Sequence, residues 1–170
     1  LKGSTMARTA WERITAAAEK YNEPGRFTAF IGYEWTSSPG GNNLHRNVIF
    51  RDAKDKADQV LPLSQYDSVD PEDLWKWMAD YEKKTGGRLL AIPHNGNLSN
   101  GLMFDDVTLT TKKVFDRDYA LRRSKWEPLY EVTQGKGTSE AHPQLSPNDE
   151  LANFEIWDRG SFGPAPKTKD

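Results

Sequence analysis

Segments with helical periodicity alternate with short apolar segments along this chain, and this alternation limits the folds that it can adopt. Two stretches place apolar residues three and four positions apart behind a capping residue, as amphipathic helices do: 5–21, capped by Ser4 or Thr5, and 70–84, capped by Asp70. A third stretch, 116–125, also looks helical. Four short stretches rich in aliphatic and aromatic residues are typical of strands: 27–35, 45–50, 88–92 and 128–132. The pattern predicts an α/β fold in which strand ends and the loops after them gather into one site.

The last part of the chain carries a further helix signal. Ser146 is a candidate cap, Pro147 suits the first helical position, and acidic residues follow in the first turn of a helix expected over 145–157. From about residue 159 the glycine, proline and lysine content predicts a loose tail. In the helix expected over 70–84, packing explains the closely spaced Trp75 and Trp77 better than ligand stacking does.

Charge and composition exclude several classes of partner. The chain has 23 basic and 25 acidic residues, a net charge of -2, and no block of five like charges, so neither nucleic acid nor an anionic membrane is indicated. No run of about 18 apolar residues is present that could span a bilayer. Cysteine is absent, so a metal would be held by histidine, carboxylate or water. The compartment, cytoplasmic or periplasmic, cannot be read from these features.

Four residues stand out as candidates for chemistry: Glu34, at the end of an expected strand, and the three histidines of the chain, His45, His94 and His142. Imidazole is a good ligand for zinc, iron or manganese, and a carboxylate can bridge two such ions. A buried carboxylate requires a positive partner, which for Glu34 is a metal or an arginine, Arg46 or Arg51. For Glu34 the metal and the arginine pairing therefore both stay open, and a hydrogen-bonded strand histidine is the more common role for His45.

His94 is the better candidate, because Pro93 stiffens the turn before it and Asn95 and Gly96 have permissive backbone angles. His142 lies in a loop with Ser139 and Glu140, where it either contacts substrate or caps the next helix, and capping is favoured slightly. Spacing alone does not define a metal site, since His-x-His, His-Glu-x-x-His and phosphate-binding glycine loops are all absent.

Four ordered stretches resemble the bacterial family catalogued as domain of unknown function 3604: 27–36, 43–50, 92–99 and 127–134. That family is similar to the PHP superfamily, named for polymerase and histidinol phosphatase, whose members hold two or three metal ions in a distorted β/α barrel. The resemblance implies that the chain is the central portion of such a barrel. The His-x-His and Asp-x-His motifs that open and close the superfamily pattern are absent, so we expect an internal segment of one domain, residues 1–170, in a longer parent chain.

The resemblance also implies roles for individual residues. Gly32-Tyr33-Glu34 matches the strand end that supplies a bridging carboxylate, and His45 and His94 match metal ligands. Glu131 is expected to contact the metal ligands rather than the metal, and Arg46, Asn95 or Lys136 is expected to bind a substrate anion. The full set of residues expected to support the ligands or bind substrate is Arg46, Asn95, Glu131, Gln134, Lys136 and His142.

The function expected from this resemblance is that of a metal-dependent hydrolase, a phosphoesterase in which divalent zinc, manganese or iron activates water. Its partners would be a small-molecule or phosphorylated substrate and the remainder of the parent chain. This segment alone is expected to bind metal weakly and to catalyse little or nothing. Two alternatives remain: a non-catalytic binding or structural domain with a degenerate site, and a carbohydrate or peptide binder that uses its aromatic residues as platforms.

Overall fold

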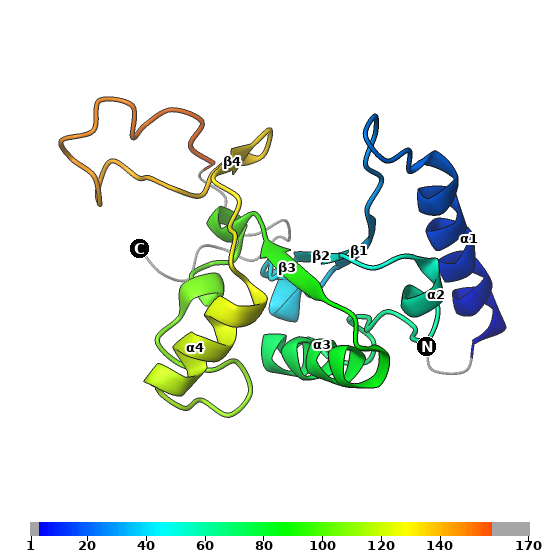
Figure 1. Ribbon diagram of the computed structural model, residues 1–170. Coiled ribbons are helices and arrows are strands. Elements are labelled where there is room, and N and C mark those ends of the chain that lie inside the picture. The colour runs from blue at the N-terminus through cyan, green and yellow to red at the C-terminus, as the bar shows by residue number, and fades with distance from the viewer. Residues whose placement is uncertain (1–3, 158–170) are drawn as a thin grey trace.

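The computed structural model describes residues 4–157, and its centre is a three-stranded antiparallel sheet in the order β1-β2-β3 (Figure 1). The strands are β1 (Ile31–Trp35), β2 (Arg46–Phe50) and β3 (Leu89–Pro93), with a separate short hairpin of β4 (Thr133–Gln134) and β5 (Gly137–Thr138). The helices are α1 (Thr5–Tyr21), α2 (Lys54–Ala57), α3 (Pro71–Thr85) and α4 (Arg117–Trp126), with single 3-10 turns η1 (Pro39–Gly41), η2 (Gly96–Leu98) and η3 (Leu102–Phe104).

The three long helices begin at residues whose side chains cap them, and they end within one residue of the expected positions. The side chains of Ser4, Asp70 and Asp116 accept hydrogen bonds from backbone N–H groups in the first turns of α1, α3 and α4. Helix α3 ends at Gly86, which has the left-handed φ of 65° common after helix ends. The helices expected over 5–21, 70–84 and 116–125 are therefore confirmed.

One face of the sheet packs on α3 and forms the core, with α3 lying below the sheet in Figure 1. Phe50 on β2 meets Tyr81 on α3 with ring centroids 5.1 Å apart. Trp75 is buried against Tyr119 of α4 at 5.3 Å, and Trp77 packs partly buried against the same core. Both tryptophans therefore pack in the protein interior, as expected.

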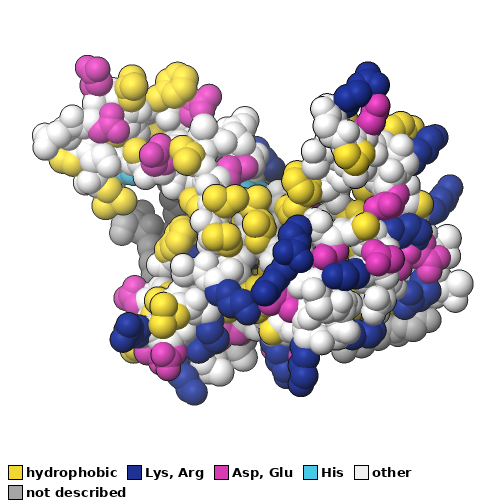
Figure 2. Space-filling model, in the orientation of Figure 1, with side chains coloured by type: hydrophobic (Ala, Val, Ile, Leu, Met, Phe, Trp, Pro, Cys, Tyr) yellow, Lys and Arg dark blue, Asp and Glu magenta, His cyan; other side chains and the backbone are white. Residues whose placement is uncertain are grey.

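The opposite face of the sheet is open. Side chains of successive strand residues alternate between the two faces. Those on this face line a largely apolar groove of about 580 Å³ with neighbouring loop residues, among them Phe30, Ile49, Leu90, Ile92 and Leu129. Figure 2 shows hydrophobic side chains gathered at the centre of the same view. Among residues 4–157, helices therefore cover only one face of the sheet.

The mixed α/β content is confirmed, but a β/α barrel is not. Within residues 4–157 the central sheet is open, and its neighbouring strands run antiparallel rather than parallel. The link between β1 and β2 holds about ten residues with only one 3-10 turn, whereas a parallel crossover needs a dozen or more, usually with a helix. The loop 37–43 consists of serine, proline, glycine and asparagine, and this composition predicts a turn that joins the first two strands as a hairpin-like pair. The antiparallel pairing of β1 with β2 confirms this prediction.

Three of the expected elements are shorter or absent. The strand expected over 27–35 begins only at Ile31, and both Phe27 and Phe30 are exposed. The strand expected over 128–132 and the helix expected over 145–157 do not form; turns and irregular backbone replace them. The tail expected from about residue 159 lies outside the described residues. No helix among residues 4–157 is both long and apolar enough to cross a membrane.

Candidate metal centre

Glu34, His45 and His94 come together at one edge of the central sheet. Strands β1 and β3 both pair antiparallel with β2, so their carboxyl ends lie at the edge where β2 begins. Glu34 is next to last in β1, His45 directly precedes β2, and His94 directly follows β3. One potential ligand atom from each residue lies within 4.8 Å of the other two. The antiparallel topology therefore gathers three residues that are up to 60 positions apart in the sequence.

One carboxylate oxygen is the centre of this cluster. Glu34 Oε1 lies 3.0 Å from His45 Nδ1 and 3.0 Å from His94 Nε2. The two imidazole rings stand nearly perpendicular, with centroids 5.7 Å apart and an interplanar angle of 78°. Two nitrogen atoms and one oxygen atom that could each bind a metal ion thus lie close together.

The cluster is open to solvent on the side of the carboxylate. The Glu34 side chain is 44% exposed, whereas those of His45 and His94 are 14% and 8% exposed. This corrects the expectation of a buried carboxylate, because Glu34 stands next to last in a strand whose neighbouring Trp35 is buried instead. The cluster is therefore accessible from solvent on the side of the carboxylate, while its two imidazoles are sheltered.

The environment of His45 favours the neutral imidazole that metals bind. Burial lowers the pKa of His45 below its usual value; Glu34 opposes this shift, while His94 and Lys136 add to it. The ring nitrogen Nε2 lies 3.0 Å from Ser38 Oγ, and the backbone N–H donates to Asn43 Oδ1 at 2.9 Å. If Nδ1 bound a cation, Nε2 would carry the ring proton and its N–H would donate a hydrogen bond to Ser38 Oγ. Such a supporting hydrogen bond is usual for a metal-bound histidine.

The backbone N–H of His94 is hydrogen-bonded, whereas the ring nitrogen Nδ1 has no hydrogen-bond partner among the described residues. Its N–H donates to the His45 carbonyl at 3.3 Å, so the two histidines are fixed to each other through the main chain. Its Nδ1 is buried and has no hydrogen-bond partner among the described residues. Because Nε2 faces Glu34, the ring already presents one nitrogen to the cluster.

The turn after His94 is clamped by Glu131. Asn95 has a left-handed φ of 52°, and its N–H donates to Glu131 Oε2 at 3.1 Å. Gln134 Nε2 contacts both oxygens of the same carboxylate at 3.0 and 2.9 Å, and the Glu131 N–H donates to the Pro93 carbonyl at 3.2 Å. Glu131 and Gln134 therefore touch the turn that carries His94 and do not touch the cluster itself.

We expect the substitution Glu131→Gln to weaken metal binding by about 10–100-fold, because supporting partners of metal ligands typically have effects of this size. The new amide would face the Gln134 amide and could no longer satisfy both neighbours as the carboxylate does. Isothermal titration with Zn²⁺ or Mn²⁺ measures the change, and Glu150→Gln, on an exposed turn, is the matched control. Equal affinities for the two variants would show that the clamp does not position His94.

The other candidate residues lie in different surroundings. Arg46 pairs with Glu127 at 2.9 Å in the interior, not with Glu34 or a substrate anion, and Arg51 lies 3.6 Å from Asp52. Asn95 is fully buried, so its contribution is to the turn and not to substrate contact.

Two candidates lie in the loops beyond the His94 turn. The Lys136 carbonyl accepts from Asn97 Nδ2 at 2.9 Å, and its charge acts on His45. His142 lies outside the cluster and accepts from the Gln144 N–H at 3.3 Å, so it caps a turn rather than the expected helix.

Two contacts of the centre were not expected from the sequence. Ser38 and Asn43 lie in the loop between β1 and β2, and each bonds His45 directly. The loop composition predicted a turn, but serine and asparagine are common in any turn. Only the strand pairing on either side of the loop brings them to the histidine.

The donor set fits a divalent transition metal. Ligand atoms placed about 2.0–2.2 Å from one tetrahedral ion lie about 3.3 Å apart. The distances of 3.0 Å from Glu34 Oε1 to each imidazole, with all three atoms within 4.8 Å, require only small side-chain shifts to meet this geometry. Two imidazoles and one carboxylate leave at least one coordination position for water or substrate.

The fold and the cluster define an α/β protein with a candidate metal centre at the edge of an antiparallel sheet. The family described as "Protein of unknown function (DUF3604)" matches residues 1–170, and the chain belongs to that family. No match was found among curated proteins or among solved structures.

Proposed function

We propose that this chain contributes a divalent-metal centre to a metal-dependent hydrolase that acts on phosphoesters. The observation that carries the proposal is the convergence of Glu34, His45 and His94, whose potential ligand atoms lie within 4.8 Å of one another. Because the chain resembles PHP proteins, we extend the proposal: the chain forms a portion of a distorted β/α barrel, and the rest of a parent chain supplies further metal ligands. Zinc, manganese and iron all suit the donors.

Each residue of the centre has a distinct role in this proposal. His45 and His94 would hold the cation from the sheltered side, and Glu34 would complete the set from the exposed side. A bound divalent ion supplies Lewis acidity and lowers the pKa of water toward about 7. Lys136 places a positive charge close enough to act on His45, and that charge would favour an anionic phosphoester at the open side.

The second candidate is a non-catalytic domain with a degenerate site. Both imidazoles contact the same oxygen of Glu34, so the three side chains can satisfy one another without a cation. In this alternative Glu34 is an acceptor of two hydrogen bonds, and the cluster stabilises the sheet edge. Metal binding separates the two proposals.

The deciding experiment is metal titration of the chain, combined with hydrolysis of p-nitrophenyl phosphate by the longest natural polypeptide that contains it. We expect one Zn²⁺ or Mn²⁺ ion to bind each chain, and hydrolysis that EDTA removes and added metal restores. Metal binding without hydrolysis would favour the degenerate site. Absence of saturable metal binding would overturn the proposal.

A further inference from the structure

The groove of about 580 Å³ on the open face of the central sheet has an apolar floor. The floor is formed by Ile49, Leu90 and Ile92, whose strand neighbours point to the other face and are buried in the core. Strand β3 therefore presents apolar side chains on both faces, a pattern typical of strands that are covered on both sides. The groove is thus suited to an apolar occupant.

Two arginines line one end of this groove, Arg51 after β2 and Arg88 before β3. The Arg51 N–H donates to the Arg88 carbonyl at 2.9 Å, so the two residues are neighbours across the strand pair. Among the described residues that line the groove, these two are the only charged ones. Figure 2 shows basic side chains directly beside the hydrophobic side chains at the centre of the view. The groove therefore combines an apolar floor with a positively charged end.

Both guanidinium groups can still bind an anion. Arg51 lies 3.6 Å from Asp52 and Arg88 lies 3.2 Å from Glu82, and the two arginine side chains are 66% and 62% exposed. Exposed ion pairs of this kind contribute little free energy, and a guanidinium has several N–H donors besides the one in each pair. A carboxylate at the end of the groove can therefore bind both arginines without breaking a strong interaction.

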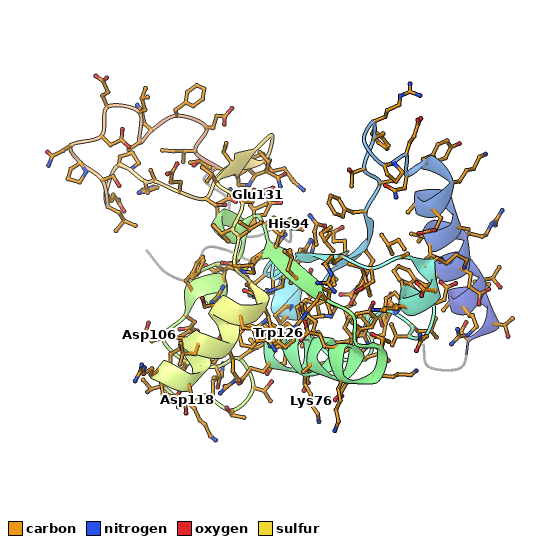
Figure 3. The ribbon with its side chains drawn as sticks, viewed as in Figure 1. Lys76, His94, Asp106, Asp118, Trp126 and Glu131 are labelled. Carbon is orange, nitrogen blue, oxygen red and sulfur yellow. The ribbon has the colours of Figure 1, made fainter. Side chains whose placement is uncertain are left out.

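The length of the groove can be measured along the strands. Ile92 pairs with Asn47, and Asn47 pairs with Glu34, so these three residues form one row across the sheet. Arg51 is four residues after Asn47, which places the arginine end about 13–14 Å from that row. In Figure 3, His94 lies at one end of β3, while Lys76 projects from α3 below the other face of the sheet.

This length matches an extended chain of about ten carbon atoms, with bonds of about 1.5 Å in a zigzag. A chain of that length would cover the floor from the arginines to Ile92 and stop before Glu34 and the two histidines. A neutral apolar molecule would make no use of the arginines, and a small hydrophilic anion would make no use of the floor. Charge and shape together therefore favour an anionic amphiphile.

We propose that the groove binds an unbranched fatty carboxylate of about ten carbon atoms. Its alkyl chain lies over Ile49, Leu90 and Ile92, and its carboxylate accepts hydrogen bonds from Arg51 and Arg88. This binding site is separate from the proposed metal centre, and its occupation requires no metal ion.

The test is calorimetric titration of the chain with sodium decanoate in the presence of EDTA. We expect saturable binding of one decanoate per chain with a dissociation constant of about 0.1 mM. Octanoate, which is two methylene groups shorter, is expected to bind about tenfold more weakly because it buries less apolar surface. Decanol is also expected to bind about tenfold more weakly, because it has the same chain length but no charge for the arginines.

The variant Arg51→Gln combined with Arg88→Gln is expected to weaken decanoate binding about tenfold and to leave decanol binding unchanged. The matched control combines Arg117→Gln with Arg122→Gln, because both arginines are exposed on α4 and neither lines the groove. This control is expected to bind decanoate as the unchanged chain does.

The apolar floor is tested separately with Leu90→Asn, which is expected to weaken the binding of decanoate and decanol alike. Leu121→Asn, at a leucine that is 58% exposed on α4 and does not line the groove, is its matched control. Urea unfolding shows whether Leu90→Asn still folds. The arginine variants test the site independently of that result.

The absence of saturable decanoate binding would overturn the proposal. So would decanol binding as tightly as decanoate, or equal losses in the arginine variant and its control. A second copy of the chain is the occupant instead if sedimentation shows a dimer that Leu90→Asn dissociates and decanoate does not. Binding to phosphatidylglycerol vesicles without binding of decanoate would identify a membrane surface instead. Because all titrations contain EDTA, their outcome leaves the proposed metal centre untouched, and failure of metal binding leaves the decanoate result standing.

Discussion

Replacing Glu127 with alanine is expected to lower the free energy of unfolding by about 3–5 kcal/mol, the usual cost of breaking a buried ion pair from one side. Glu127 accepts hydrogen bonds from Arg46 Nε at 2.9 Å, Trp75 Nε1 at 2.8 Å and Arg123 Nε at 3.1 Å. The side chains of Arg46 and Glu127 are only 2% and 1% exposed, so the Glu127→Ala variant leaves the Arg46 charge without a carboxylate in the interior. Urea unfolding followed by circular dichroism measures the loss.

The control is an exposed ion pair in the same region. Glu72 pairs with Arg122 at 2.9 Å, and their side chains are 31% and 51% exposed, so Glu72→Ala is expected to cost less than about 1 kcal/mol. A similar small loss for Glu127→Ala would show that Arg46 is solvated after the substitution. Arg46 is the first residue of β2, directly after His45, so the Glu127 variant is also expected to weaken metal binding.

Local sequence signals predicted the helices well, because caps and apolar periodicity act within a few residues. Ser4, Asp70 and Asp116 each accept from a backbone N–H two or three positions later, and the N–H of Gly86, after the last residue of α3, donates to the Glu82 carbonyl. Such contacts can be read from neighbouring residues alone. Asp70 is the N-cap that the sequence predicted, Ser4 is one of the two candidates for the first helix, and Asp116, expected as the first helical residue, is the N-cap of α4.

The helix expected over 145–157 failed because a capping signal cannot replace packing. Leu145, Leu151 and Phe154 are strongly exposed and only the small Ala152 is buried, so little apolar surface of this segment packs on the rest of the protein. Helices of this length are marginal in water without tertiary contacts. Glu155 has a φ of 55°, which a helix does not allow.

Strand direction was the main feature of the fold that hydrophobic patterns left undetermined. A short apolar run is compatible with parallel or antiparallel pairing, and only the turn-forming loop between the first two strands indicated the antiparallel case. The antiparallel sheet still brings the same three residues together, because β1 and β3 flank β2 and end at its starting edge. The set Glu34, His45 and His94 came from family resemblance, since spacing alone did not define it.

The largest effect on ligand binding is expected from Glu34→Gln and His94→Ala, each of which should reduce Zn²⁺ or Mn²⁺ affinity by more than about 100-fold. Loss of a direct ligand exceeds the roughly 10–100-fold effect of losing a supporting partner. His142→Ala is the matched histidine control and is expected to bind metal as the unchanged chain does, because His142 lies outside the cluster. Calorimetric titration of the three variants and the unchanged chain makes the comparison.

Glu34→Gln also distinguishes a metal centre from a hydrogen-bonded cluster. The glutamine amide oxygen can still accept hydrogen bonds from His45 and His94, as Glu34 Oε1 does at 3.0 Å, so a merely structural cluster should lose little stability. A divalent cation, however, loses a charged oxygen ligand and with it much of its affinity. Unchanged metal affinity in Glu34→Gln would remove the carboxylate from the ligand set. A loss of affinity with little change in the unfolding free energy would identify Glu34 as a metal ligand.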